Sequence, residues 1–152
     1  RSVWTGRWPI QKNSQLSLTL LQDERIGIRP RQCFYNAWKT MIHCREFADA
    51  AYVEGVAVIG GLALDHGWIE KNGEILDPTL PEGSLVYFPG LILDGEREVA
   101  EAMRLPRQDG CDDLPLLNRF GWGGHESAEF CRAREGASRL VLHNLERWAT
   151  SR

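Results

Sequence analysis

Residues 61–80 read GLALDHGWIEKNGEILDPTL, and this stretch has the pattern of a β-hairpin. Residues 62–70 alternate well enough to form one strand. Asn72 and Gly73 supply the two residues with positive φ that a tight type I′ turn requires. Residues 74–77 return as the partner strand, so we expect two antiparallel strands joined by a two-residue loop.

The register of this hairpin places a histidine beside an aspartate. With a two-residue loop, Lys71 lies opposite Glu74 and Trp68 lies opposite Asp77. His66 is then the diagonal neighbour of Asp77 on the same face, roughly 7–8 Å away between backbones. A carboxylate at that position can bind an imidazole and fix its orientation. Because a His and an Asp on a half-exposed sheet often do no chemistry, the functional interpretation depends on a nucleophile elsewhere in the chain.

Composition limits the class of protein. The chain has 152 residues, of which 43% are hydrophobic and 26% are charged, which suits a single globular domain over residues 1–152. A net charge of −3 argues against a protein that binds nucleic acid through its phosphates. No run of 18 apolar residues occurs, so we expect no membrane span. The first residue is Arg1 and nothing after it has the pattern of a signal peptide, so a cytoplasmic location is the expectation for this piece of chain.

The four cysteines, Cys33, Cys44, Cys111 and Cys131, form no CxxC pair, and free thiols in a reducing compartment are their simplest account. A metal site drawn from Cys111, His125 and Cys131 is disfavoured, because residues six apart on a helix point to different sides. We therefore expect neither a metal nor another cofactor.

The strongest helical pattern in the sequence runs over residues 32–51, where apolar residues recur near 3.6-residue spacing after Pro30. Cys33 lies in its first turn. A thiol there faces the positive end of the helix dipole and unpaired backbone N–H groups, which favours a lowered thiol pKa and leaves donors for an oxyanion. Cys44, on nearly the same face further along, is expected to be a buried core residue.

The other elements are expected from their composition and their Gly and Pro boundaries. They are a strand at 52–59, a strand at 85–88 ending at Pro89-Gly90, a short strand at 91–93, a helix at 96–104, a loop over 107–124, and a last helix from His125 or Ser127 to Trp148 that is interrupted at Gly136 and covers the sheet with Leu140, Val141, Leu145 and Trp148. Residues 15–22 fit a strand or a helix, and Trp4 and Trp8 are expected to pack over the domain.

In this chain order, several motifs resemble the transglutaminase-like branch of the papain-like superfamily. That family has a Cys at a helix N-terminus, a strand with His-Ala-Trp and a strand ending in Asp-Pro-Thr. The matching residues, which lie within about a third of the chain, are Cys33, the Tyr-Val-Glu-Gly of residues 52–55, His66-Gly67-Trp68 and Asp77-Pro78-Thr79. Two departures are Gly67, where Ala is usual, and the absence of the common Gly-Val lead-in before Cys33.

The resemblance implies an α+β, papain-like or transglutaminase-like fold, in which the helix that carries Cys33 packs on an antiparallel sheet that carries His66 and Asp77. It implies Cys33 as nucleophile, His66 as general base and Asp77 as the residue that orients the imidazole. The Cys33 N–H is the expected oxyanion donor, and the Gln32 side chain is a second candidate. Trp68 is expected on the substrate side, where it would shield the His–Asp pair from water, and a core role alone is the alternative.

These roles describe a thiol-dependent hydrolase or acyltransferase that acts on an amide or peptide-like bond in a protein or peptide-like substrate. Protease, amidase, deamidase and acyl transferase chemistry all remain open. The alternative is a binding module that retains the fold without turnover.

Overall fold

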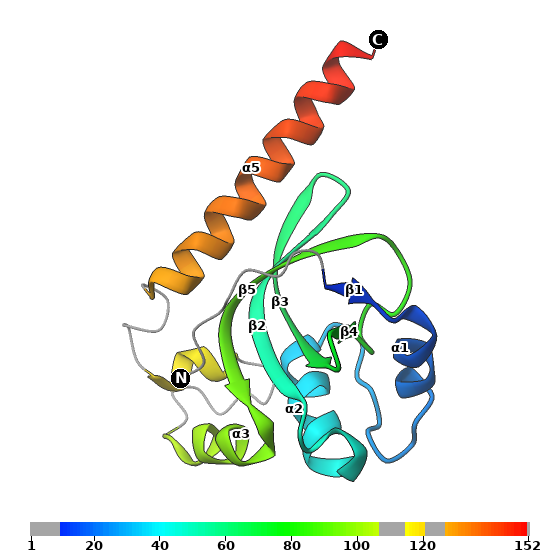
Figure 1. Ribbon diagram of the computed structural model, residues 1–152, viewed down its shortest axis with the longest axis vertical. Helices are drawn as coiled ribbons and strands as arrows, with labels where there is room; N and C mark the ends of the chain where they lie inside the picture. Colours follow the sequence, from blue (N-terminus) through cyan, green and yellow to red (C-terminus); the bar gives the residue numbers. More distant parts are fainter. Residues whose placement is uncertain (1–9, 107–114, 121–126, 152) are drawn as a thin grey trace.

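A computed structural model describes residues 10–106, 115–120 and 127–151 of the chain. Five strands form one open sheet in the order β1-β4-β3-β2-β5, with β1 and β4 parallel and the other pairs antiparallel (Figure 1). The strands are β1 Gln11–Lys12, β2 Ala51–Ile59, β3 Leu62–Lys71, β4 Glu74–Leu76 and β5 Leu85–Asp94. The helices are α1 Ser14–Leu21, α2 Cys33–His43, α3 Gly95–Arg104 and α5 Ala128–Thr150, with the 3-10 helices η1 Arg45–Phe47 and η2 Leu116–Phe120. The expected α+β class is confirmed.

The predicted hairpin is present as β3 and β4. Asn72 and Gly73 have φ angles of 53° and 77°, as a type I′ turn requires, and Lys71 pairs with Glu74. The ladder ends at Leu76, so Asp77 lies one residue beyond the last pair. The expected pairing of strands is therefore confirmed up to the residue before the aspartate.

The two strands expected at 85–88 and 91–93 are instead one strand, β5. It pairs with β2 along its whole length, and a register shift between Glu54 and Gly55 takes up the extra residue where Pro89 lies opposite Gly55. The prediction treated Pro89-Gly90 as a strand end. A proline is tolerated here because β5 is an edge strand and because the regular hydrogen-bond ladder, to which proline cannot donate, is already interrupted at the bulge.

Three helical expectations also change. Helix α2 ends at His43, eight residues early, because Cys44 adopts extended dihedral angles and η1 follows. Residues 14–21 form helix α1, capped by the Asn13 side chain, which settles the choice left open by the sequence. Helix α5 is continuous through Gly136, whose missing side chain leaves room for the Phe88 ring; a Cβ there would lie 2.8 Å from the ring.

The two faces of the sheet have different cores. Tyr52, Val56 and their neighbours face α2, η2 and the first half of α5, whereas Val53 and Ala57 face a cluster with Trp68. Helix α5 then runs beyond the sheet (Figure 1). The expectation that its whole apolar side covers the sheet is wrong for the C-terminal half, where Leu145 and Trp148 are 51% and 60% exposed, whereas Leu140 and Val141 do pack on the core.

Some expectations fall on residues outside the described ranges. These are the packing of Trp4 and Trp8, the whole of the metal candidate except Cys131, and the loop at 107–124 apart from residues 115–120, where η2 forms. No described helix has the length and apolar character needed to cross a membrane.

Candidate functional site

His66 and Asp77 form a buried pair. The His66 Nε2 atom lies 2.8 Å from Asp77 Oδ2, and the two residues are 4% and 0% exposed. His66 lies on β3 and Asp77 follows β4, so the type I′ turn and the pairing of these two strands bring them together. The predicted diagonal contact is therefore confirmed.

The Asp77 carboxylate accepts four hydrogen bonds. Oδ2 binds His66 Nε2 and the Tyr87 hydroxyl, which is 2.9 Å away, while Oδ1 accepts the N–H groups of Thr79 and Leu80 at 3.1 and 3.0 Å. By itself, burial would raise the pKa of Asp77. The hydrogen bond and positive charge of His66, followed by the Leu80 N–H and the Tyr87 hydroxyl, hold this pKa below its usual value.

The imidazole of His66 is a strong base for a buried histidine. Burial lowers its pKa, but the hydrogen bonds with Asp77 and Cys33 and the charges of both groups raise it to about 9. The ring therefore carries a proton at neutral pH. Since Nε2 is bound to Asp77, the remaining ring nitrogen is Nδ1.

Cys33, the first residue of α2, lies beside His66 because the helix start approaches β3 very closely. A Cβ on Gly67 would lie 2.9 Å from the Phe34 ring and 3.1 Å from the Phe34 Cα atom. This contact sets the start of α2 against β3 next to His66, and the imidazole forms a hydrogen bond with the Cys33 side chain. Glycine is favoured at position 67 because a larger side chain would collide with Phe34. Cys33 itself is 8% exposed.

Two buried polar side chains that the sequence did not single out hold the start of α2 and the aspartate. The Asn36 amide bonds both the N–H and the C=O of Arg29, at 2.9 and 2.8 Å, and donates to Thr79 Oγ1 at 2.9 Å. The Asp77 N–H donates to Ser17 Oγ on α1 at 2.9 Å. Nothing in the pattern around Asn36 or Ser17 distinguishes them from ordinary helix residues.

The two residues expected on the oxyanion or substrate side lie in different surroundings. Gln32, half-buried, is the N-cap of α2, and its side chain makes no capping hydrogen bond. Trp68 is fully buried, lies nearly parallel to the His66 ring at 6.3 Å and donates to Glu70 Oε1 at 3.0 Å. Trp68 is therefore a buried residue that packs beside the His66 ring, whereas Gln32 directly precedes the nucleophile in the chain.

A second buried carboxylate, Glu54, lies on the opposite face of β2. It accepts hydrogen bonds from the Tyr52 hydroxyl at 2.5 Å, from the Leu117 N–H at 3.1 Å and from the Leu116 N–H. Burial, with the charge of Asp65 as a smaller cause, raises the pKa of Glu54 to about 7 against the effect of these donors. Glu54 thereby ties η2 to the central strand.

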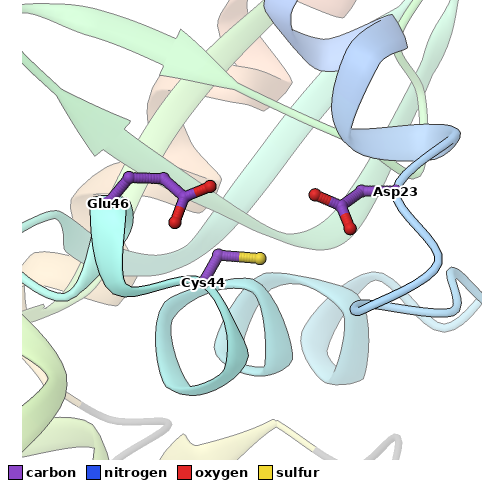
Figure 2. A group of neighbouring side chains, drawn as sticks. All are labelled: Asp23, Cys44 and Glu46. Carbon is purple, nitrogen blue, oxygen red and sulfur yellow. The ribbon is translucent and has the colours of Figure 1, made fainter.

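Among the described residues, one group has its donor atoms gathered as a metal site would need: Asp23, Cys44 and Glu46 (Figure 2). The Arg25 guanidinium already occupies that position. Its Nη2 atom lies 2.6 Å from Asp23 Oδ2 and 2.6 Å from Glu46 Oε1. A positive charge of the chain itself thus already bridges the two carboxylates, and the group gives no reason to invoke a metal.

The chain was compared with family models, curated proteins and solved structures, and none of the three comparisons finds a match.

Proposed function

We propose that this chain is a thiol-dependent enzyme that acts on an amide or peptide-like bond through Cys33, His66 and Asp77. The buried 2.8 Å contact between His66 and Asp77 carries the proposal, because it gives the imidazole one orientation and leaves Nδ1 for the thiol at the start of α2. The order of the three residues and the Asp-Pro-Thr motif further favour the transglutaminase-like branch of the papain-like superfamily.

In the proposed reaction, Cys33 Sγ attacks the carbonyl carbon as a thiolate, and the proton resides on His66, whose pKa of about 9 keeps it there at neutral pH. The carbonyl oxygen becomes an oxyanion. The N–H groups of the first turn of α2 are the proposed donors to it, since the Gln32 side chain does not cap them. Gln32 itself is a second donor candidate.

The tetrahedral intermediate collapses as His66 gives its proton to the departing nitrogen and the C–N bond breaks, which leaves a thioester on Cys33. Water or a second amine then attacks the thioester, loses a proton to His66 and displaces the thiolate. Asp77 stays ionised and orients the ring throughout. Hydrolysis, deamidation and acyl transfer differ only in the leaving group and in the second nucleophile, and a protein or peptide-like amide is the proposed substrate.

A second candidate, a binding module that keeps the fold without turnover, is favoured by one observation. Cys33 and His66 are only 8% and 4% exposed, so a substrate carbonyl reaches them only through a narrow opening or after a movement. In that case the thiol would be shielded and unreactive, a property that can be measured directly.

Alkylation by iodoacetamide with peptide mapping separates the two candidates, because the chain contains its own reference thiol. Cys131 on α5 is exposed, whereas Cys33 is buried. An activated Cys33 is expected to react faster than Cys131 at pH 7, and His66→Ala is expected to reverse that order. His43→Ala, at the other end of α2 and exposed, is the matched control and should leave the Cys33 rate unchanged. Faster labelling of Cys131 in the parent protein would favour the binding module.

Turnover tests the roles themselves. Against a pool of glutamine-containing and amide peptides, Cys33→Ala and His66→Ala should each abolish release of ammonia or amine, and Asp77→Asn should cost less. Because the groups act as a unit, the double variant Cys33→Ala/His66→Ala should be no worse than either single one. Activity that survives in Cys33→Ala would rule out Cys33 as the nucleophile and with it the thiol-dependent mechanism.

A further inference from the structure

Tyr87 contacts the candidate site from a strand that contributes nothing else to it. Its hydroxyl donates to Asp77 Oδ2 at 2.9 Å, the same oxygen that His66 Nε2 binds. Tyr87 lies on β5, and β2 separates this strand from β3 in the sheet. The side chain therefore reaches across a whole strand to make this bond.

The strand between them lacks a side chain at the crossing point. Gly55 pairs with His66 on one side and with Pro89 on the other. A Cβ on Gly55 would lie 2.9 Å from the Trp68 ring. Without one, the rings close over β2: His66 and Tyr87 are 6.4 Å apart, and Trp68 and Tyr87 are 5.0 Å apart.

The two oxygens of Asp77 are held differently. Both donors to Oδ1, the Thr79 and Leu80 N–H groups, belong to the turn that carries the aspartate itself. The second oxygen, Oδ2, is held instead by side chains of two other strands, β3 and β5. Oδ2 accepts the hydrogen bond of the Tyr87 hydroxyl beside its contact with His66. Burial, followed by the charge of Asp77, raises the pKa of Tyr87 far above its ordinary value, so this hydroxyl keeps its proton.

We propose that Tyr87 is a positioning residue: it fixes Asp77 Oδ2 so that His66 keeps its Nε2 on the carboxylate and turns its Nδ1 to Cys33. The proposal rests on the proposed function for its catalytic meaning. Its geometric content, the restraint on the His66 ring, holds independently of any turnover.

The test compares Tyr87→Phe with Tyr52→Phe. Each variant removes one hydroxyl that donates to a buried carboxylate of the same sheet, but only Tyr87 touches Asp77. Two properties are measured: the exchange rate of the His66 Nε2 proton by NMR, and the ratio of iodoacetamide rates at Cys33 and Cys131. For Tyr87→Phe we expect proton exchange to be faster, and the rate ratio lower, by about tenfold, since hydrogen bonds to charged groups are the strong ones. Because Tyr52 also interacts with Cys33, Tyr52→Phe is compared in proton exchange alone, and it should leave that rate within about twofold.

Equal values of both properties in Tyr87→Phe and in the parent would overturn the positioning role, and so would an equal increase of His66 proton exchange in the two variants. If Cys33 is unreactive in the parent, the proposed function fails, yet proton exchange at His66 still decides the role of Tyr87. Should Tyr87→Phe fail to fold, 3-fluorotyrosine at position 87 keeps the shape and makes the hydroxyl a stronger donor. It should then draw charge from Asp77 and lower the His66 titration midpoint, and an unchanged midpoint would overturn the proposal.

Discussion

The two faces of β2 each bury a tyrosine hydroxyl bonded to a carboxylate, and the two pairs differ in charge. On one face Tyr87 donates to Asp77, and on the other Tyr52 donates to Glu54. Both carboxylates are 0% exposed, and both also accept two backbone N–H groups. Nevertheless the pKa of Asp77 is lowered, whereas that of Glu54 is raised to about 7.

The partner that differs is a cation. Asp77 has His66 at 2.8 Å, whereas the charge that acts on Glu54 is the negative one of Asp65. Hydrogen bonds alone therefore do not offset the cost of burying a carboxylate in this sheet, and an adjacent positive charge does. Four substitutions test this difference, and the largest effect is expected where the cation itself is removed.

His66→Gln keeps a side-chain donor but removes the positive charge. We expect the pKa of Asp77 to rise above its ordinary value, as that of Glu54 does, and the free energy of unfolding at pH 7 to fall by about 3–5 kcal/mol, the usual cost of breaking a buried pair. Urea unfolding and the ¹³C shift of the Asp77 carboxyl group measure the two effects. An Asp77 pKa that stays low in this variant would show that its hydrogen bonds and the charge of Lys12 suffice without His66.

Glu54→Gln tests the other carboxylate through pH. The folded pKa of about 7 exceeds the ordinary 4.5, so the folded state binds the proton more tightly. The stabilisation by protonated Glu54 is complete below pH 4.5 and is lost as pH rises to 7, by about 3 kcal/mol. Glu54→Gln should lack this fall between pH 4.5 and 7. His66 is present in both proteins, so its titration cancels in the difference. Parallel stability curves would show that Glu54 is already ionised at low pH.

Gly55→Ala affects the face on which the charged pair lies. The added Cβ would lie 2.1 Å from the Phe88 carbonyl oxygen and 2.9 Å from the Trp68 ring, so we expect a loss of about 2–3 kcal/mol from overpacking. Gly61→Ala is the control, because nothing lies within 4 Å of a Cβ there. Thermal melts of the two variants give the comparison. Equal melting temperatures would mean that the close contact at Gly55 relaxes without cost.

Asp65→Asn should produce the smallest effect. Asp65 is half-exposed and lies 3.7 Å from Arg134, so its ion pair is worth less than about 1 kcal/mol. Removing its charge should nevertheless lower the pKa of Glu54, since Asp65 contributes to raising it. NMR titration of the Glu54 carboxyl group detects the shift, and a rise of that pKa would contradict the electrostatic account.

The sequence predicts well where local rules apply. Asn72-Gly73 and the alternation of residues 62–70 predict both the turn and the register, because positive φ and period-two alternation are properties of a few adjacent residues. Helix α2 is predicted at its start and missed at its end. Its apolar pattern continues past His43, but the chain turns into η1, so the helical periodicity did not reveal where the helix stops.

By itself, the sequence determined the hairpin, the shared face of His66 and Asp77, and a cysteine at a helix start. Only the tertiary structure decided what surrounds them. Asn36 meets Thr79 across 43 positions and Glu54 meets Leu116 across 62, and no local pattern marks either partner. The contrast between the two carboxylates likewise depends on burial and on charges brought from other strands. Periodicity is local, whereas the free energy of a buried charge sums contributions from everything folded around it.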